Sequence, residues 1–405
     1  MPTTALALDH LLRAVGDPVA DLRCIGPDHP EFVRAQAIVA AAGVLAKVPG
    51  AFPAIADAIR AAASLPKSPP EASHFAAAGA WIRGDPVLAA ETYAFLLSRW
   101  PQDVLALRLA QSCYFFLGRH ERLCALVDAV MGDWDPCDER FGFVLAMASF
   151  AHAENGNAAY AEALGRRALA QDGACPLGVH AVAHAIAESG RPGSGARWMR
   201  EQSGHWARDS RMRTHNAWHL AMFDVEHGDL ASALDVLDKW LIPASETSAL
   251  DACDAAGLLF ELESRGIVDR GRWGRVSDAF ERTAAPGFWP YVDLHAALAH
   301  FRAGDEVRAK RLEQAIDRHA KASDCAGLRA RRVTRPGLAA LRAWAEGRHA
   351  KAARAFAALR PFLGDAGGSR VQLALFERIE RDAVRRRAGL RAAAAHGVIS
   401  QPSYG

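Results

Sequence analysis

Hydrophobic residues recur every three or four positions along most of the chain, which is the spacing of one face of an α-helix. No segment of comparable length alternates apolar and polar residues as a half-buried strand does. The pattern therefore predicts an all-α protein. A glycine followed by a polar residue or a new helix recurs at intervals of 34 (118 − 84) to 43 (347 − 304) residues, a period typical of helical-hairpin solenoids. These glycines are Gly84, Gly118, Gly156, Gly190, Gly228, Gly266, Gly304 and Gly347.

Residues 74–101 show the repeat unit most clearly. They contain a helix rich in small residues, a Gly-Asp turn, Pro86 at the first position of a second helix, and a closing proline. This hairpin resembles the tetratricopeptide repeat, with Gly79 and Ala90 as small packing residues of the facing helices. We expect a right-handed α-solenoid of degenerate tetratricopeptide-like hairpins, with further copies at 102–133, 138–172, 176–205, 211–243, 246–285, 290–321 and 335–364.

The pattern predicts three parts. Residues 1–69 form an N-terminal helical cap, and residues 70–321 form the repeat array. Residues 320–336 are rich in Arg and Lys and end in Pro336, so we expect a loop-like connector there. Residues 335–405 hold one more hairpin and a capping helix at about 370–395, which covers apolar surface at the end of the array.

Composition narrows the class of protein. The 405 residues are 51% hydrophobic and 23% charged, which is typical of a soluble globular chain. The N-terminus has no basic start and no uncharged run of 18 residues follows, so we expect a cytoplasmic protein with no membrane segment. Seven widely spaced cysteines without a CxxC pair favour reduced thiols over a disulfide framework or a thiolate zinc site.

Charge is unevenly distributed although the net charge is only +2. Residues 305–405 contain 21 Lys/Arg and 10 Asp/Glu, a net of 21 − 10 = +11, which leaves 2 − 11 = −9 for residues 1–304. No aromatic interleaving or known nucleic-acid module accompanies the basic residues, so we favour a solvated arginine face. Nucleic acid is therefore not an expected partner, and a protein partner is left open.

Histidines gather in the centre of the predicted array. HAVAH contains His180 and His184, and HNAWH contains His215 and His219; residues four apart share one face of a helix. His180, His219 and His295 lie at similar distances before their turn glycines (190 − 180 = 10, 228 − 219 = 9, 304 − 295 = 9). First helices of stacked hairpins lie about 10 Å apart on the concave side. We therefore expect all five histidines to line one pocket.

Other polar residues lie on the same face of the first helices as the histidines. Glu154 lies two residues before a turn glycine, and Asp254 and Asp293 lie in the first helices of the next two repeats. With Asn216 and Trp218 of HNAWH, they are the expected ligand-binding residues. Imidazoles beside carboxylates can bind a small polar or anionic molecule or a short peptide, or transfer protons near neutral pH. The plain structural alternative is that the histidines hydrogen-bond to one another within the wall of the array.

A metal centre is a further alternative for the same cluster. The four histidines of HAVAH and HNAWH would give three or four imidazole ligands, which suit zinc, iron or copper, and a carboxylate such as Glu154 or Asp254 would complete the set. Neither pair reads HExxH, so the base of the HExxH metalloproteases is missing. The cofactor is left open, with a divalent transition metal, zinc or iron, as the candidate.

Several motifs resemble the tetratricopeptide repeat protein 38 family. They are HAVAH with its Gly-Arg turn, HNAWHLAMF (215–223), DAAGLLFEL (254–262) and DLHAALA (293–299), and the resemblance covers about residues 30–305. It implies an intracellular α-solenoid of degenerate repeats and no particular biochemical activity. On this resemblance, the family's recurrent polar positions fall on Glu154, His180, His184, His215, Asn216, Trp218, His219, Asp254, Asp293 and His295.

Two positions depart from that family. It often has Glu three residues before the turn glycine of the HAVAH helix, where this chain has Ala187 and carries Glu188 one position later, about 100° round the helix. The second Trp of the family's HNxWH motif is Ala217 here. Both changes weaken a carboxylate-metal site that depends on Glu188.

We therefore expect a ligand-binding repeat protein with a histidine-lined pocket centred on residues 138–305, because repeat arrays are mostly binders. The first alternative is an enzyme that uses the same cluster for metal-dependent or acid-base chemistry. The second is a protein-interaction scaffold. An exposed apolar groove would favour the scaffold, whereas a closed polar cavity would count against it.

Overall fold

Helices make up the regular structure of the chain. The computed structural model describes residues 3–173, 175–207 and 210–395. Within these ranges there is no strand, and the only β-type pairing is an isolated bridge between Val15 and Ser210. None of the helices in these ranges combines the length and the hydrophobicity needed to cross a bilayer. The predicted all-α class is confirmed.

Eight antiparallel helix pairs form the array, and the predicted solenoid of helical hairpins is confirmed. The eight turn glycines named above all have positive φ, from 64° to 97°, a conformation that glycine adopts without steric cost. The pairs are α5 (Pro69–Ile82) with α6 (Pro86–Arg99), α7 (Val104–Leu117) with α8 (His120–Met131), α9 (Phe141–Glu154) with α10 (Ala158–Gln171), α11 (Pro176–Glu188) with α12 (Pro192–Glu201), α14 (Arg213–His227) with α15 (Leu230–Val236), α17 (Ala249–Ser264) with α18 (Arg270–Thr283), α19 (Pro290–Ala303) with α20 (Glu306–His319), and α22 (Arg335–Ala345) with α23 (His349–Leu359).

The Gly-Asp turn explains why many second helices begin where they do. The aspartate after the turn glycine accepts a hydrogen bond from a backbone N–H in the first turn of the next helix, which satisfies an otherwise unpaired donor. Asp85 caps α6, Asp229 caps α15 and Asp305 caps α20 in this way, with N–O distances of 2.9–3.1 Å. Short elements complete the middle of the array: α13 (Ser203–Trp206), a π-helical turn (Leu237–Leu241) and α16 (Ile242–Ser245).

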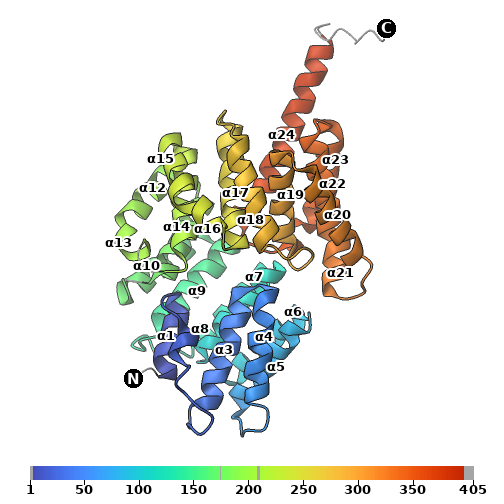
Figure 1. Ribbon diagram of the computed structural model, residues 1–405. Coiled ribbons are helices and arrows are strands. Elements are labelled where there is room, and N and C mark those ends of the chain that lie inside the picture. The colour runs from blue at the N-terminus through green and yellow to red at the C-terminus, as the bar shows by residue number, and fades with distance from the viewer. Residues whose placement is uncertain (1–2, 174, 208–209, 396–405) are drawn as a thin grey trace.

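Neighbouring first helices pack against one another along the array, in the order α7, α9, α11, α14, α17, α19 and α22. Figure 1 shows the resulting curve, from the blue and teal hairpins to the orange ones. Four helices precede the hairpins and lie beside α5 and α7: α1 (Thr4–Arg13), α2 (Pro18–Asp21), α3 (Phe32–Ala46) and α4 (Phe52–Ala61), with a 3-10 turn (Pro49–Ala51) before α4. The order of helices therefore places one side of every first helix towards the interior of the curve.

An aromatic cluster joins the loop before α19 to the N-terminal helices. Phe288 and Trp289, in the loop before α19, contact rings of the N-terminal helices. The ring centroids of Phe288 lie 5.9 Å from Phe52, 6.2 Å from Trp81 and 5.3 Å from Phe116, and Trp289 lies 5.0 Å from Phe116. Such edge and tilted contacts add to the burial of large apolar rings. The loop before α19 thus closes the curve against α4, α5 and α7.

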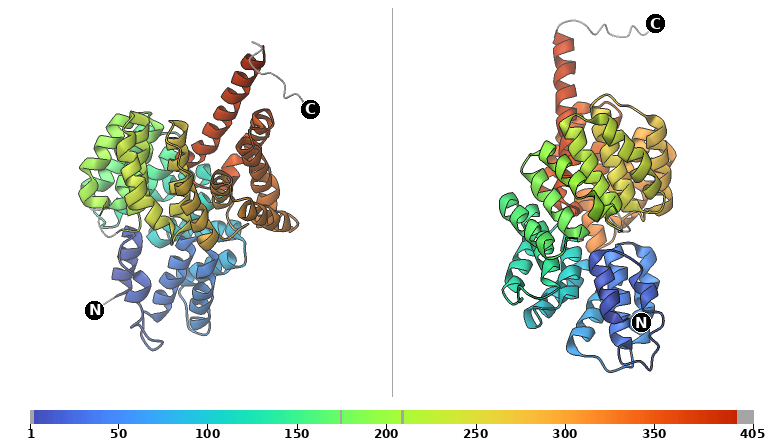
Figure 2. Two further views of the ribbon diagram at one scale, coloured as in Figure 1. Left: turned by 45° about the horizontal axis from the view of Figure 1, so that its top comes forward. Right: turned by 90° about the vertical axis from the view of Figure 1, so that its left-hand side faces the viewer.

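The C-terminal segment also packs against the interior of the curve. A 3-10 turn (Arg360–Ala366) leads into α24 (Arg370–Ala395), whose last turns extend beyond the other helices in both views of Figure 2. At the start of α24, the Arg370 backbone N–H donates to Glu154 Oε2 at 2.7 Å, and the Phe376 ring lies 5.1 Å from His295. Residues 396–405, the end of the expected C-terminal part, lie outside the described residues.

The loop-like connector predicted at 320–336 is wrong. This segment contains α21 (Cys325–Arg329) and a π-helical turn (Ala330–Thr334) that continues into α22. Asp324 caps α21 through the Gly327 N–H at 2.8 Å, and the Arg329 side chain is buried and donates to the carbonyl oxygens of Phe116 and Ala366. An arginine-rich segment predicts side chains exposed to solvent, but Arg329 is instead buried and donates to buried carbonyl oxygens, which need a hydrogen-bond partner.

Replacing Gly118 by Ala tests the contact between α7 and the C-terminal segment. A Cβ at Gly118 would lie 1.8 Å from the Gly364 carbonyl oxygen, whereas a Cβ at Gly84 would meet nothing within 4 Å. Both glycines have positive φ, so each alanine costs about 1–2 kcal/mol of backbone strain. We expect Gly118→Ala to lose about 1–3 kcal/mol more than Gly84→Ala in chemical denaturation, because of overpacking. Equal losses would contradict the close approach.

Candidate functional site

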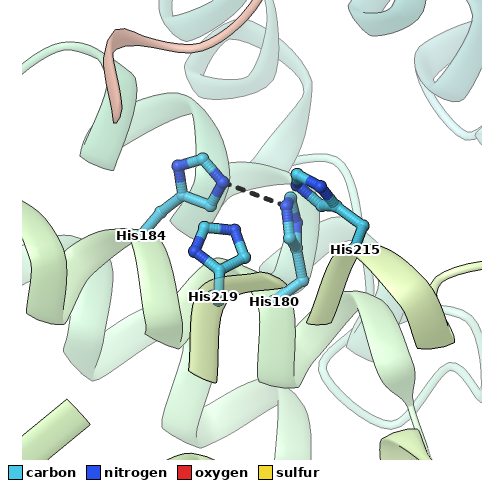
Figure 3. A group of neighbouring side chains, drawn as sticks. All are labelled: His180, His184, His215 and His219. Atoms are coloured by element: carbon cyan, nitrogen blue, oxygen red, sulfur yellow. Dashed lines mark hydrogen bonds between the residues drawn. The ribbon is translucent and has the colours of Figure 1, made fainter. Parts of the chain in front are cut away.

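Four histidines from two neighbouring helices point towards a common centre. His180 and His184 lie on α11 and His215 and His219 on α14, and Figure 3 shows the four rings facing one another. Their candidate ligand atoms all lie within 4.8 Å of one another, and His184 Nε2 lies 3.0 Å from His180 Nε2. The one-turn spacing within each motif and the packing of α11 against α14 account for the cluster.

Two buried carboxylates contact the outer side of this cluster. Glu154 Oε1 lies 2.9 Å from Nδ1 of His184, and Asp254 Oδ2 lies 2.7 Å from Nδ1 of His215. Contacts of the carboxylates with Nδ1 favour the tautomers that carry the proton there and leave the lone pair on Nε2. Nε2 of His184 itself lies in the contact with His180. Gln372 of α24 donates to the other oxygen of Asp254 at 3.3 Å. The carboxylates therefore orient the imidazoles.

Burial sets the protonation of the cluster. It lowers the pKa of His180 and of His219 well below the usual value, and the neighbouring imidazoles act in the same direction. Burial is the largest single influence on His215 and opposes its protonation, but the charge and hydrogen bond of Asp254 and the charge of Asp251 together raise the pKa of His215. Burial would raise the pKa of Glu154, yet the contacts with His184 and His120 and the Arg370 N–H lower it. The cluster thus combines neutral imidazoles with one that protonates readily.

Trp218 and Asn216 support the cluster from behind. The Trp218 ring stacks on His215, with centroids 5.3 Å apart and an interplanar angle of 12°. Asn216 is completely buried, and neither of its side-chain polar atoms has a hydrogen-bond partner among the described residues. Neither side chain lines the cavity described below. Their expected contact with a ligand therefore stays a prediction without geometric support.

His295 and Asp293 lie outside the four-histidine cluster. His295 Nδ1 donates to the Tyr291 carbonyl oxygen at 2.7 Å, and burial lowers the pKa of this imidazole to about 4. Asp293 accepts from the Gly287 N–H at 3.1 and 3.2 Å, so it orders the loop that carries Phe288. Both residues lie on α19, the first helix of its hairpin. Phe376 of α24 packs against His295, and Asp293 is engaged by the loop before α19 through the Gly287 N–H. The structure does not bring them to the cavity.

A cavity of about 240 Å³ lies on the inner face of the array, beside the cluster. This volume is far above the roughly 15 Å³ that one water needs. His180, His184 and His215 line it, whereas His219 lies behind them. Its walls come from α7, α9, α11, α14, α17 and the beginnings of α19 and α24.

Sequence reasoning missed three cations that line the same cavity: Arg211, and the pair Lys47 and Arg108. Among the described residues neither Lys47 nor Arg108 forms an ion pair: Lys47 Nζ donates only to the Leu45 carbonyl oxygen at 3.2 Å, and Arg108 Nε is buried without a partner. Burial, aided by the Arg108 charge, lowers the pKa of Lys47 to about 7, and burial lowers the pKa of Arg108 to about 10. Lys47 and Arg108 are therefore neighbouring cations that face the cavity without a carboxylate partner among the described residues.

The sequence carries a signal for Arg108, whereas the signal for Lys47 lies in the backbone conformation. Arg108 lies ten residues before Gly118 (118 − 108 = 10), the same offset that His180 has from Gly190. Lys47 ends helix α3 with φ at 51°, a left-handed conformation that usually selects glycine or asparagine. A lysine at that helix end is a local strain that points to a role for its side chain.

A second group of possible ligands lies away from the cavity. His152 Nδ1 lies 3.4 Å from Cys124 Sγ, and His152 Nε2 lies 2.9 Å from Asp128 Oδ1. Burial and the Asp128 charge raise the pKa of the Cys124 thiol to about 11, so the thiol stays protonated at neutral pH. A protonated thiol is a weak ligand and a weak nucleophile, and this group is the poorer candidate.

The fold and the cavity define an all-α helical-hairpin repeat protein with a histidine-lined internal cavity. No protein-family model matches the chain. A tetratricopeptide repeat protein from Parabacteroides merdae is 15% identical, with a TM-score of 0.42 over 65% of this chain and 90% of that one. An IFIT1 monomeric mutant with Gppp-AAAA is 12% identical, with a TM-score of 0.46 over 90% and 83%, and human IFIT1 with PPP-AAAA is 13% identical, with 0.44 over 95% and 92%. Similarity this distant transfers no function, and membership of the tetratricopeptide repeat protein 38 family stays a prediction.

Two glutamates beside Arg370 should respond oppositely to neutralisation. The lowered pKa of Glu154 means that its charge stabilises the fold above the unfolded pKa, and this contribution is lost as pH falls through the folded pKa. Burial raises the pKa of the half-buried Glu188, so its charge opposes folding at neutral pH. We expect Glu154→Gln to lose about 1–3 kcal/mol in urea denaturation at pH 7 and Glu188→Gln to lose none. A stable Glu154→Gln variant would contradict the assigned contacts.

Proposed function

We propose that this protein binds a small anionic molecule in the internal cavity. The observation that carries the proposal is the pair Lys47 and Arg108, which line the cavity and form no ion pair among the described residues. Asp251 and Asp254 also line the cavity, but neither pairs with these cations. Desolvated like charges that form no ion pair are costly, and a bound anion would supply the counter-charge. His215, whose pKa is raised, adds a third donor on the facing wall.

The lining of the cavity suits a small molecule. Phe115, Phe150 and Trp289 supply apolar surface, while Gln111 and Ser112 of α7 add polar groups beside Arg108. Mostly apolar walls with a few convergent polar groups are typical of ligand sites. The start of α24 lines the inner face as well, through Ser369 and Gln372, which leaves less of that face for a protein segment. We therefore favour a small ligand over the scaffold alternative.

A cytoplasmic location is part of the same proposal. All seven cysteines are unpaired, which supports a reducing compartment. The enzyme alternative uses the same histidines, and anion binding is the step that it would share.

Lys47→Gly should separate binding from stability. Glycine removes the charge and relieves the left-handed strain at this helix end, so we expect the variant to be about 1 kcal/mol more stable than wild type at neutral pH. Yet no anion should stabilise it. The measurement is a thermal-shift screen at constant ionic strength with phosphate, acetate, succinate and citrate, using neutral succinamide as the matched control for succinate. At least one anion should raise the Tm of wild type; equal shifts in Lys47→Gly, or shifts matched by succinamide, would contradict the proposal.

Anion affinity should fall as pH rises above about 7, because Lys47 then loses its proton in the empty cavity. The charged neighbour Arg108 keeps its own proton in this range, since its pKa is about 10. In Lys47→Arg the charge persists, and the fall should be shallower. Isothermal titration at several pH values, with the anion found in the screen, measures both slopes; identical slopes would show that another group controls binding.

A further inference from the structure

We propose that His180, His184, His215 and His219 together bind one divalent transition-metal ion, of the zinc class, in the wall of the cavity. All four rings offer a nitrogen within 4.8 Å of the others. In a tetrahedral zinc site with Zn–N bonds of about 2.0–2.1 Å, neighbouring nitrogens lie about 3.3 Å apart. The observed 3.0 Å between Nε2 of His180 and Nε2 of His184 is close to that edge. Small ring movements would bring the other two into range.

Hydrogen bonding alone does not account for this cluster. Only the His180–His184 contact is a hydrogen bond among the four rings, and Nε2 of His219 is buried with no partner among the described residues. His219 is only 1% exposed. Its ring centroid lies 4.6 Å from the ring centroid of His184 and 4.8 Å from that of His215. A buried acceptor without a donor is destabilising. A metal ion at the common centre would engage this nitrogen (Figure 3).

The carboxylates lie where metal-binding imidazoles have their outer partners. Glu154 contacts Nδ1 of His184 and Asp254 contacts Nδ1 of His215, so the ligand atom of each ring is Nε2. In His184 the ion would replace the hydrogen bond of this nitrogen with His180. This carboxylate–histidine arrangement fixes the tautomer and the orientation of metal ligands. Imidazole sets suit zinc, copper, iron and nickel better than calcium or magnesium. The donor set therefore selects a transition metal.

The ion would be accessible from the cavity on one side. His180, His184 and His215 line the cavity, and His219 lies behind them. An ion bound among the four rings would therefore face the cavity on the side of the three lining histidines. An anion held by Lys47 and Arg108 would share the cavity with it. The two sites share His215, but the ion does not require the anion, because its four ligands come from α11 and α14 while Lys47 and Arg108 come from the end of α3 and from α7.

The test is metal analysis of the full chain, purified without a polyhistidine tag, stripped with a chelator and reconstituted with Zn²⁺ in the absence of added anions. We expect one zinc per chain by plasma mass spectrometry and a raised Tm relative to the stripped protein. His184→Ala and His219→Ala should each lose the ion. His295→Ala is the matched control, because it removes a buried histidine of a first helix outside the cluster and should keep the ion.

Two further measurements keep the proposal testable if a variant misfolds. The visible spectrum of Co²⁺-loaded wild type should show tetrahedral nitrogen ligation without a thiolate charge-transfer band; that band would assign the ion to Cys124 and overturn the proposal. Asp254→Asn should weaken Zn²⁺ binding by about 10–100-fold, since Asp254 positions His215. A folded wild type that retains no zinc, or folded His184→Ala and His219→Ala variants that retain it, would also overturn it. Either result leaves the anion screen with stripped protein unaffected.

Discussion

The arrangement around the cavity depends on one buried carboxylate, Glu154 at the end of α9. A charge out of contact with water must be matched by neighbouring charges and hydrogen-bond donors, or the fold loses several kcal/mol. Here His184 of α11 and the first backbone N–H of α24 meet this requirement. Glu154 thereby fixes the orientation of one imidazole of the cluster and the docking of the C-terminal helix at once. The position of Gln372, and through it Asp254, follows from that docking.

Much of the fold was predictable because its determinants are local. The turn glycines, the capping aspartates and the helical spacing of apolar residues all act within one hairpin, and they occur where the helices end and begin. The connector at 320–336 was the exception. Arg329 is buried there by contacts with Phe116, which lies more than two hundred residues earlier (329 − 116 = 213), and no local pattern reports such a partner.

The candidate site was predictable to the extent that it lies on successive first helices. Similar distances from the turn glycines predict that the histidine pairs of HAVAH and HNAWH lie together, with Glu154 and Asp254 next to them, and the structure shows these contacts. The same spacing cannot show that Phe376 of α24 packs against His295, which does not line the cavity. It also overlooked Lys47, because that residue reaches the cavity from a helix outside the repeats.

The aromatic contact between Phe288 and Phe52 has a consequence for how the chain unfolds. In an open repeat array each hairpin touches only its neighbours, so unfolding can begin at either end and stop partway. Contacts between residues 236 positions apart (288 − 52 = 236) join the loop before α19 to α4, and the hairpins between them become a closed circuit of interfaces. Separating two neighbouring hairpins then also disturbs the contact that closes the circuit. This coupling favours unfolding in a single cooperative transition. Because closure joins distant parts of the chain, it is a step of folding with a high entropic cost.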